Sequence, residues 1–187
     1  HQYRNGACTV CGAKDPRWTG PERPWNDPFR DVRASDWFYS GVKFAYQHGL
    51  FQGTAADMFS PDAPMTRAML VTVLWRMDGQ PDTAGGSSFT DVPRGQWYTE
   101  AVAWAAENGV VNGVGGGKFE PDGNVTREQI ATILYRYAGL RGVPTGGRAD
   151  LGSFPDGGAV SGWAYDALSW ANAAGLIAGT REGGVDY

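Results

Sequence analysis

The chain has 187 residues, of which 42% are hydrophobic and 13% aromatic, and its formal net charge is −4. This composition indicates a folded protein with a core rather than a disordered chain. No apolar run approaches the ~18 residues that cross a bilayer, and the acidic balance without a Lys/Arg block argues against nucleic acid as a partner. Two cysteines are too few for a disulfide framework. No signal-peptide pattern follows His1, so we expect any export signal to have been removed or excluded.

The N-terminal segment, residues 1–28, carries a Cys-x-x-Cys motif and a linker. Cys8 and Cys11 resemble half of a small zinc knuckle. A structural zinc site needs four ligands, and His1 is the one other local candidate, so we expect a remaining ligand upstream of this chain. A local disulfide or two free thiols fits the pair equally well. Residues 12–28, rich in Trp and Pro, are predicted to be the linker.

The rest of the chain repeats itself. When the sequence is shifted by 60 residues, 29–79 aligns with 89–139 without a gap, and 17 of the 51 aligned residues are identical. A third copy over 154–187 stops about halfway through the unit. Residues 80–88 and 140–153, rich in Gly, Pro, Ser and Thr, are predicted linkers. We therefore expect two complete repeats and a partial third.

The sequence pattern of each complete repeat predicts a first helix, a loop and a second helix. The first helices are expected at 37–48, 97–108 and 163–174, where apolar residues recur at helical spacing and a glycine follows. A loop rich in Gly, Pro and Asp comes next. The fold class is therefore all-α, and since one repeat is too small to bury its apolar face alone, neighbouring repeats must pack together.

The second helices are predicted to start at Thr66 and Thr126 and to end at glycines, Gly79 and Gly139. Thr126 and the glutamine three residues later form a capping-box pattern, in which each side chain satisfies an orphan backbone amide of the other. The first repeat has Met69 at the corresponding position and keeps half of this device.

The recurring motifs are Phe-x-Asp-Val, a tryptophan, a helix ending in Gly, then Phe-x-Pro-Asp and Thr-Arg. In this order they resemble the S-layer homology (SLH) repeat, over more than four fifths of the chain. The resemblance implies a pseudo-threefold bundle at the bacterial cell surface, extracellular and non-catalytic. It also implies binding to an anionic, often pyruvylated, secondary cell-wall polysaccharide. The family's usual Thr-Arg-Ala-Glu is incomplete here, since the final Glu is replaced in both copies.

The two Thr-Arg pairs are the main candidates for ligand binding. Arg67 and Arg127 follow Thr66 and Thr126 at the first helical position, where a cation costs roughly 0.3–1 kcal/mol against the helix dipole. Its recurrence suggests an offsetting anion, held by free backbone amides and a guanidinium group. The alternative is that each Arg pairs with an aspartate of its own fold and clamps two repeats together.

Three further groups recur in the repeats: Trp37, Trp97 and Trp163; Asp31 and Asp91; Gly53 and Gly113. The tryptophans could stack on a sugar ring, but core packing is the favoured interpretation, since they open the apolar stripe of the first helix. The aspartates fit helix caps or turn formers better than direct ligands. The glycines permit a sharp turn, and exposed backbone there could meet a glycan.

A wall-active hydrolase and a protein–protein or self-assembly module are the two alternative function classes. A wall-active hydrolase needs a singular catalytic constellation, and the prominent Asp residues instead recur once per repeat, so we expect no enzyme. A protein–protein or self-assembly module stays the alternative. The incomplete third repeat predicts that a third ligand groove is absent or weakened. It also predicts a partly uncovered helix, with the apolar residues Trp163, Leu168, Trp170, Ala171 and Ile177. We expect either that another chain covers this face by self-association or that the chain is a fragment of a longer protein.

Overall fold

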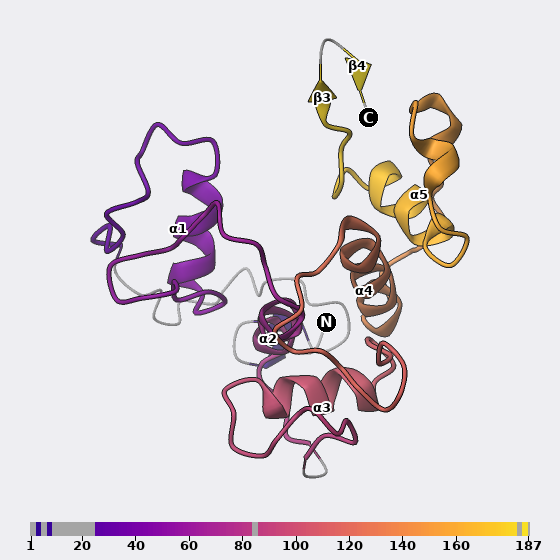
Figure 1. Cartoon of the computed structure of the whole chain (residues 1–187). Helices are drawn as coiled ribbons and strands as arrows, with labels where there is room; N and C mark the ends of the chain where they lie inside the picture. The colour runs from indigo at the N-terminus through magenta and orange to yellow at the C-terminus, as the bar shows by residue number, and fades with distance from the viewer. Residues whose placement is uncertain (1–2, 5–6, 9–24, 84–85, 183–184, 187) are drawn as a thin grey trace.

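The computed structural model describes residues 3–4, 7–8, 25–83, 86–182 and 185–186. Within these ranges the chain forms five α-helices, two single-turn 3-10 helices and two short antiparallel strand pairs (Figure 1). The elements are β1 Tyr3–Arg4, β2 Ala7–Cys8, α1 Tyr39–Gln47, α2 Arg67–Met77, α3 Thr99–Glu107, α4 Arg127–Leu140, η1 Leu151–Ser153, η2 Gly157–Ala159, α5 Tyr165–Ala173, β3 Arg181–Glu182 and β4 Val185–Asp186. The helical class predicted from the sequence is confirmed.

The helices pack across the repeat boundaries. α2 of the first repeat lies against α3 of the second, and α4 of the second lies against α5 of the third (Figure 1). The largest core cluster joins α2, α3 and one residue of α4, with Val71, Val102 and Ile133 buried together. A smaller cluster joins α4 to α5 through Ala131 and Trp170. Neighbouring repeats therefore complete each other's cores, as the small size of one repeat predicted.

The α1 region has a core of its own. Phe29, Val32 and Val42 are buried there among aromatic side chains that all lie between residues 25 and 59. Among the described residues, no second helix of a repeat packs over α1, whereas α2 packs over α3 and α4 packs over α5. Phe44 is consequently 55% exposed, whereas Trp104, which holds the same place in the second repeat, is 3% exposed.

The first helices of the repeats, α1, α3 and α5, begin two residues later than predicted, after a short turn. The amide of Tyr39 donates to the carbonyl of Asp36, and that of Thr99 to the carbonyl of Gln96. The preceding tryptophans therefore stand on the turn and outside the apolar stripe of the helix. Their side chains are 91%, 55% and 60% exposed for Trp37, Trp97 and Trp163, so the core-packing interpretation is wrong.

One predicted helix end is also wrong. α2 ends as expected, at Gly79 with φ +84°. α4 instead continues through Gly139 to Leu140, and the left-handed residue that stops it is Gly142, with φ +68°. Its amide donates to the carbonyl of Gly139, and the amide of Val143 donates to Ala138, which is the Schellman pattern.

The third repeat is better covered than the sequence suggested. Trp170 is 5% exposed and Ala171 fully buried, because α4 packs over them. Residues that were predicted as linker add to this cover: the indole of Trp170 donates to the carbonyl of Pro144, and the hydroxyl of Ser169 to that of Ala149. The expectation of an uncovered α5 face therefore fails at Trp170 and Ala171, while Leu168 and Ile177 are half-buried.

A nearly buried ion pair ties the ends of α2 and α4 together. Arg141 and Asp78, the C-cap residues of the two helices, lie 2.7 Å apart with side chains 16% and 12% exposed. Burial raises the pKa of Asp78, which the Arg141 charge partly opposes. Burial together with the Asp78 charge raises the pKa of neighbouring Tyr137 to about 12. Such a pair specifies how the two helix ends meet, at a desolvation cost.

Arg141→Met is expected to destabilise the protein by about 2–3 kcal/mol, since it leaves the Asp78 carboxylate without its cation. Because the Asp78 pKa in the folded protein already exceeds its unfolded value, ionised Asp78 opposes folding, and the defect must shrink as the pH falls and the carboxyl group takes up a proton. Urea unfolding at neutral and acidic pH measures this, with Asp78→Asn/Arg141→Met as the control that removes the stranded charge. A defect that grows on acidification contradicts the prediction.

Candidate functional site

A groove of about 430 Å³ opens where the three repeats meet. Its lining comes from the start of α2, the loop after α3, one face of α4 and the turn before α5: Arg67, Val111, Asn112, Gly113, Val114, Gln129, Thr132, Ile133, Arg136 and Trp163. Three residues predicted from the sequence as candidates, Arg67, Gly113 and Trp163, therefore line one surface. Arg136 was not predicted as a candidate.

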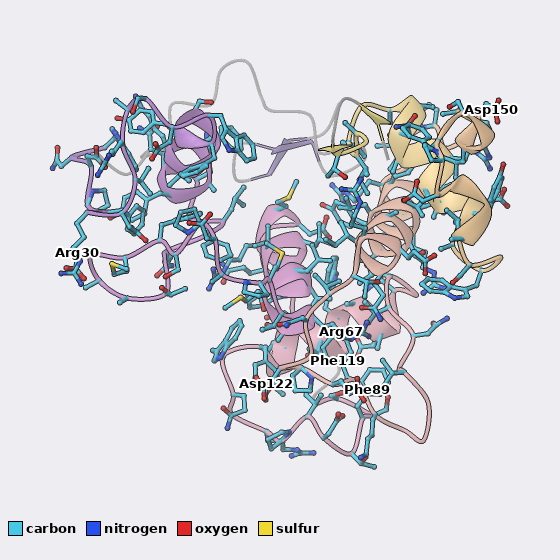
Figure 2. All side chains as sticks on the ribbon, turned by 45° about the horizontal axis from the view of Figure 1, so that its top comes forward. Arg30, Arg67, Phe89, Phe119, Asp122 and Asp150 are labelled. Atoms are coloured by element: carbon cyan, nitrogen blue, oxygen red, sulfur yellow. The ribbon has the colours of Figure 1, made fainter. Side chains whose placement is uncertain are left out.

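Arg67 is the most buried charged residue of the described chain, at 5% exposure. Its Nε donates to the carbonyl of Phe119 at 2.8 Å, a longer 3.5 Å contact joins Nη2 to the carbonyl of Asn112, and the guanidinium carbon lies 4.7 Å from the Phe119 ring centroid. Figure 2 shows Arg67 beside Phe119 and Phe89 at the junction of α2 with the second repeat. Burial lowers its pKa, which the charges of Glu120 and Asp91 partly oppose. Arg67 thus joins two repeats.

The partners of Arg67 differ from the predicted alternative. Among the described residues no carboxylate lies within ion-pair distance of Arg67, so its clamp is made to backbone carbonyls and an aromatic face rather than to an aspartate. The first amides of α2 are also occupied: Arg67 donates to the carbonyl of Gly123 and Ala68 to that of Pro121. The Met69 amide donates to the N-cap hydroxyl of Thr66. The predicted free amides are therefore not available for an anion here.

Arg127 stands at the same place in α4 but is exposed. Its Nη2 donates to the carbonyl of Ala178, which occupies the position of Asn112 in the third repeat. It lines a second hollow of about 320 Å³ together with Phe154 and Ile177. Thr126 caps α4, and the predicted capping box with Gln129 is present. Arg67 and Arg127 therefore both contact a carbonyl at the same repeat position, that of Asn112 and of Ala178, but Arg67 is buried and Arg127 is exposed.

The two aspartates hold the Phe-x-Pro-Asp loop rather than cap a helix. Asp31 accepts hydrogen bonds from the amides of Phe59 and Ser60, and Asp91 accepts from those of Phe119 and Glu120, all at 2.7–2.9 Å. Burial by itself raises the pKa of both carboxyl groups, but these amides outweigh it and lower the pKa. Asp91 thereby fixes the loop that carries the Phe119 carbonyl, and so fixes the place of Arg67.

The paired glycines are required by close packing. A Cβ on Gly53 would strike the Met58 carbonyl oxygen and the Phe29 ring, and one on Gly113 would strike the Lys118 carbonyl oxygen and lie 2.7 Å from the Phe89 ring. Gly53 also has φ +88°. The backbone at each glycine packs directly against the first phenylalanine of its repeat, Phe29 or Phe89. Gly113 also lines the edge of the groove.

The zinc hypothesis lies outside the described side chains, since His1 and Cys11 are not described and Cys8 is described as part of strand β2 alone. In the described part of the chain no cluster of three or more His, Cys, Asp or Glu side chains is arranged to hold a metal ion. Among those same residues, no helix is both long and apolar enough to cross a membrane.

Comparison with known proteins identifies the repeats. The S-layer homology domain matches residues 28–68, 88–131 and 153–183. The chain is 30% identical to an endoglucanase of Bacillus sp. (strain KSM-635) over 83% of its length, and 31% identical to the surface-layer 125 kDa protein of Lysinibacillus sphaericus over 81%. It is 35% identical to the S-layer protein sap of Bacillus anthracis over 57%.

The chain spans 16%, 12% and 13% of the length of these three relatives. The shared part is therefore a module common to an enzyme and to surface-layer proteins. The three matched segments fall one in each repeat, and they include Arg67, the 111–114 loop, Gln129 and Trp163 of the groove. The chain belongs to the S-layer homology domain family, and its place is the extracellular surface of a bacterial cell.

Proposed function

We propose that the chain is a non-catalytic anchoring module that binds an anionic secondary cell-wall polysaccharide, with pyruvylated sugar as the ligand class. The observation that carries the proposal is the groove between the repeats, where two arginines and a 60% exposed tryptophan line one surface. Guanidinium groups suit carboxylates, and an exposed aromatic face suits the apolar face of a sugar ring. The Arg127 hollow is the second, more open candidate.

The relatives support an anchoring role and not a catalytic one. An endoglucanase and two surface-layer proteins have different overall roles, and what this chain shares with each of them is a small fraction of their length. A module common to all of them fits attachment better than a chemistry found in one of them. We propose that the repeats span 29–79, 89–139 and 154–187, with linkers at 80–88 and 140–153 and an N-terminal segment at 1–28.

The test is retention on purified Gram-positive sacculi. We expect the chain to sediment with intact sacculi and to stay in the supernatant once hydrofluoric acid has stripped the secondary polymer. It should release no soluble sugar on long incubation. Equal sedimentation with stripped sacculi, or none with intact sacculi, overturns the proposal.

Self-assembly is the second candidate, and the exposure of Trp37 and Phe44 in the α1 region is the observation that favours it. Light scattering across a concentration series distinguishes the two functions. Growing assemblies in the absence of polymer support self-assembly, and a constant mass supports anchoring.

A further inference from the structure

Arg136 is the groove cation whose guanidinium is not committed within the described chain. It lies on α4, is half-buried and lines the groove. Among the described residues it makes no ion pair or side-chain hydrogen bond. Arg76, its counterpart in the first repeat, donates from Nη1 to the carbonyl of Leu50. The same residue type in the same helix position is therefore tied down in one repeat and available in the other.

Arg67 is poorly placed to meet a ligand directly. Its Nε is spent on the Phe119 carbonyl, one face of its guanidinium covers the Phe119 ring, and 5% of its surface is accessible. A ligand acid would have to displace these internal contacts to form a bidentate pair with Arg67. Arg136 requires no such displacement, since nothing described in the protein competes for its donors.

The surroundings of Arg136 match an acidic sugar. Gln129, Thr132 and Arg136 follow one another at helical spacing and line the groove from one face of α4. The Thr132 hydroxyl donates to the Glu128 carbonyl and the Gln129 side chain completes the capping box, so Arg136 is the polar group of this face without a described partner. Trp163 lines the same groove from the third repeat, and its indole is 60% exposed. A ring carrying one carboxylate can meet a guanidinium at one end and an aromatic face at the other.

We propose that Arg136 is the specificity residue of this groove: it pairs with the carboxylate of an acidic hexose whose ring packs on Trp163, while Arg67 acts as a positioning residue that holds the groove wall. This inference rests on the proposed function and adds that the Arg136 guanidinium makes the groove selective for an acidic sugar. It assigns recognition of the charge to α4, outside the Thr-Arg motif.

The test uses the full chain and two small probes, the methyl glycoside of a hexose 4,6-pyruvate ketal and the methyl ester of the same compound, which lacks the charge. Calorimetry should show that the unaltered protein prefers the acid to the ester. Arg136→Gln should weaken binding of the acid about tenfold or more, the size of a charge-assisted hydrogen bond, and abolish the preference. The melting temperature should stay unchanged, since Arg136 holds no described neighbour.

Arg94→Gln is the matched control, since it removes the same charge from an exposed position in the turn before α3. It should keep the preference for the acid. Arg136→Gln that retains this preference at an unchanged melting temperature overturns the inference while leaving the anchoring function intact. If the unaltered protein fails to sediment with sacculi, the anchoring function itself is refuted. Trp163→Ala should weaken acid and ester alike, and a loss confined to the acid contradicts the role given to its ring.

Discussion

Arg67→Met is expected to destabilise the protein by about 3 kcal/mol, which lowers the melting temperature of a chain of this size by roughly 6–12 °C. Methionine replaces much of the buried aliphatic stem, but it donates no hydrogen bond. The Phe119 carbonyl oxygen then loses its 2.8 Å donor, and the Phe119 ring loses the cation above it. The measurement is thermal unfolding followed by circular dichroism.

Arg127→Met is the matched control, because it changes the same motif position in the other complete repeat. Arg127 is exposed and makes one described hydrogen bond, to the Ala178 carbonyl, so its loss should cost less than about 1 kcal/mol. Similar melting temperatures for the two variants would mean that burial of Arg67 contributes nothing, and would contradict its role as a clamp between repeats.

Gly113→Ala is expected to cost about 4 kcal/mol or more, or to prevent folding of the second and third repeats. A Cβ at this position collides with the Lys118 carbonyl oxygen, which is backbone and cannot swing away, and it lies 2.7 Å from the Phe89 ring. Relief requires the loop to lift off Phe89, and the loop carries both a groove wall and the Asn112 carbonyl. Urea unfolding of the purified variant gives the cost.

Gly146→Ala provides the comparison, since a Cβ there meets no atom within 4 Å and its backbone has no positive φ. It should change stability by less than about 1 kcal/mol, and in the stabilising direction, because alanine restricts the unfolded chain. A Gly113 variant as stable as the Gly146 variant would show that the loop yields easily, and would remove the steric reason for this glycine.

Local signals in the sequence predicted the repeats, the helical class and the caps. Thr66 and Thr126 cap their helices as their spacing predicted, because a cap involves residues three positions apart. The prediction that Trp37 opens the helix is wrong because a turn and the first turn of a helix share the same apolar spacing. The choice between them depends on backbone hydrogen bonds such as that from the Tyr39 amide to the Asp36 carbonyl.

The site was harder to predict because its partners lie far apart in the chain. Arg67 reaches Phe119, 52 residues away, and nothing near Arg67 in the sequence marks that contact. Arg136 did carry a signal, since it is identical to Arg76 in the aligned repeats. That signal could not show that one of the two is bonded to a carbonyl within its own repeat and the other faces a groove, because the difference arises from how the repeats pack.

The pairing of α2 with α3 and of α4 with α5 has a consequence for anyone who wishes to recombine such modules. A chimaera spliced between repeats, at residues 80–88, would set a foreign helix against Trp104 and break the largest apolar contact. A splice at residues 61–65 separates the α1 lobe, which has its own core, and leaves both helix pairs whole. The hydrogen bond from Arg76 to the Leu50 carbonyl is a contact that such a splice has to preserve. The segment that can be exchanged without breaking a helix pair is thus offset from the sequence repeat by about half a repeat.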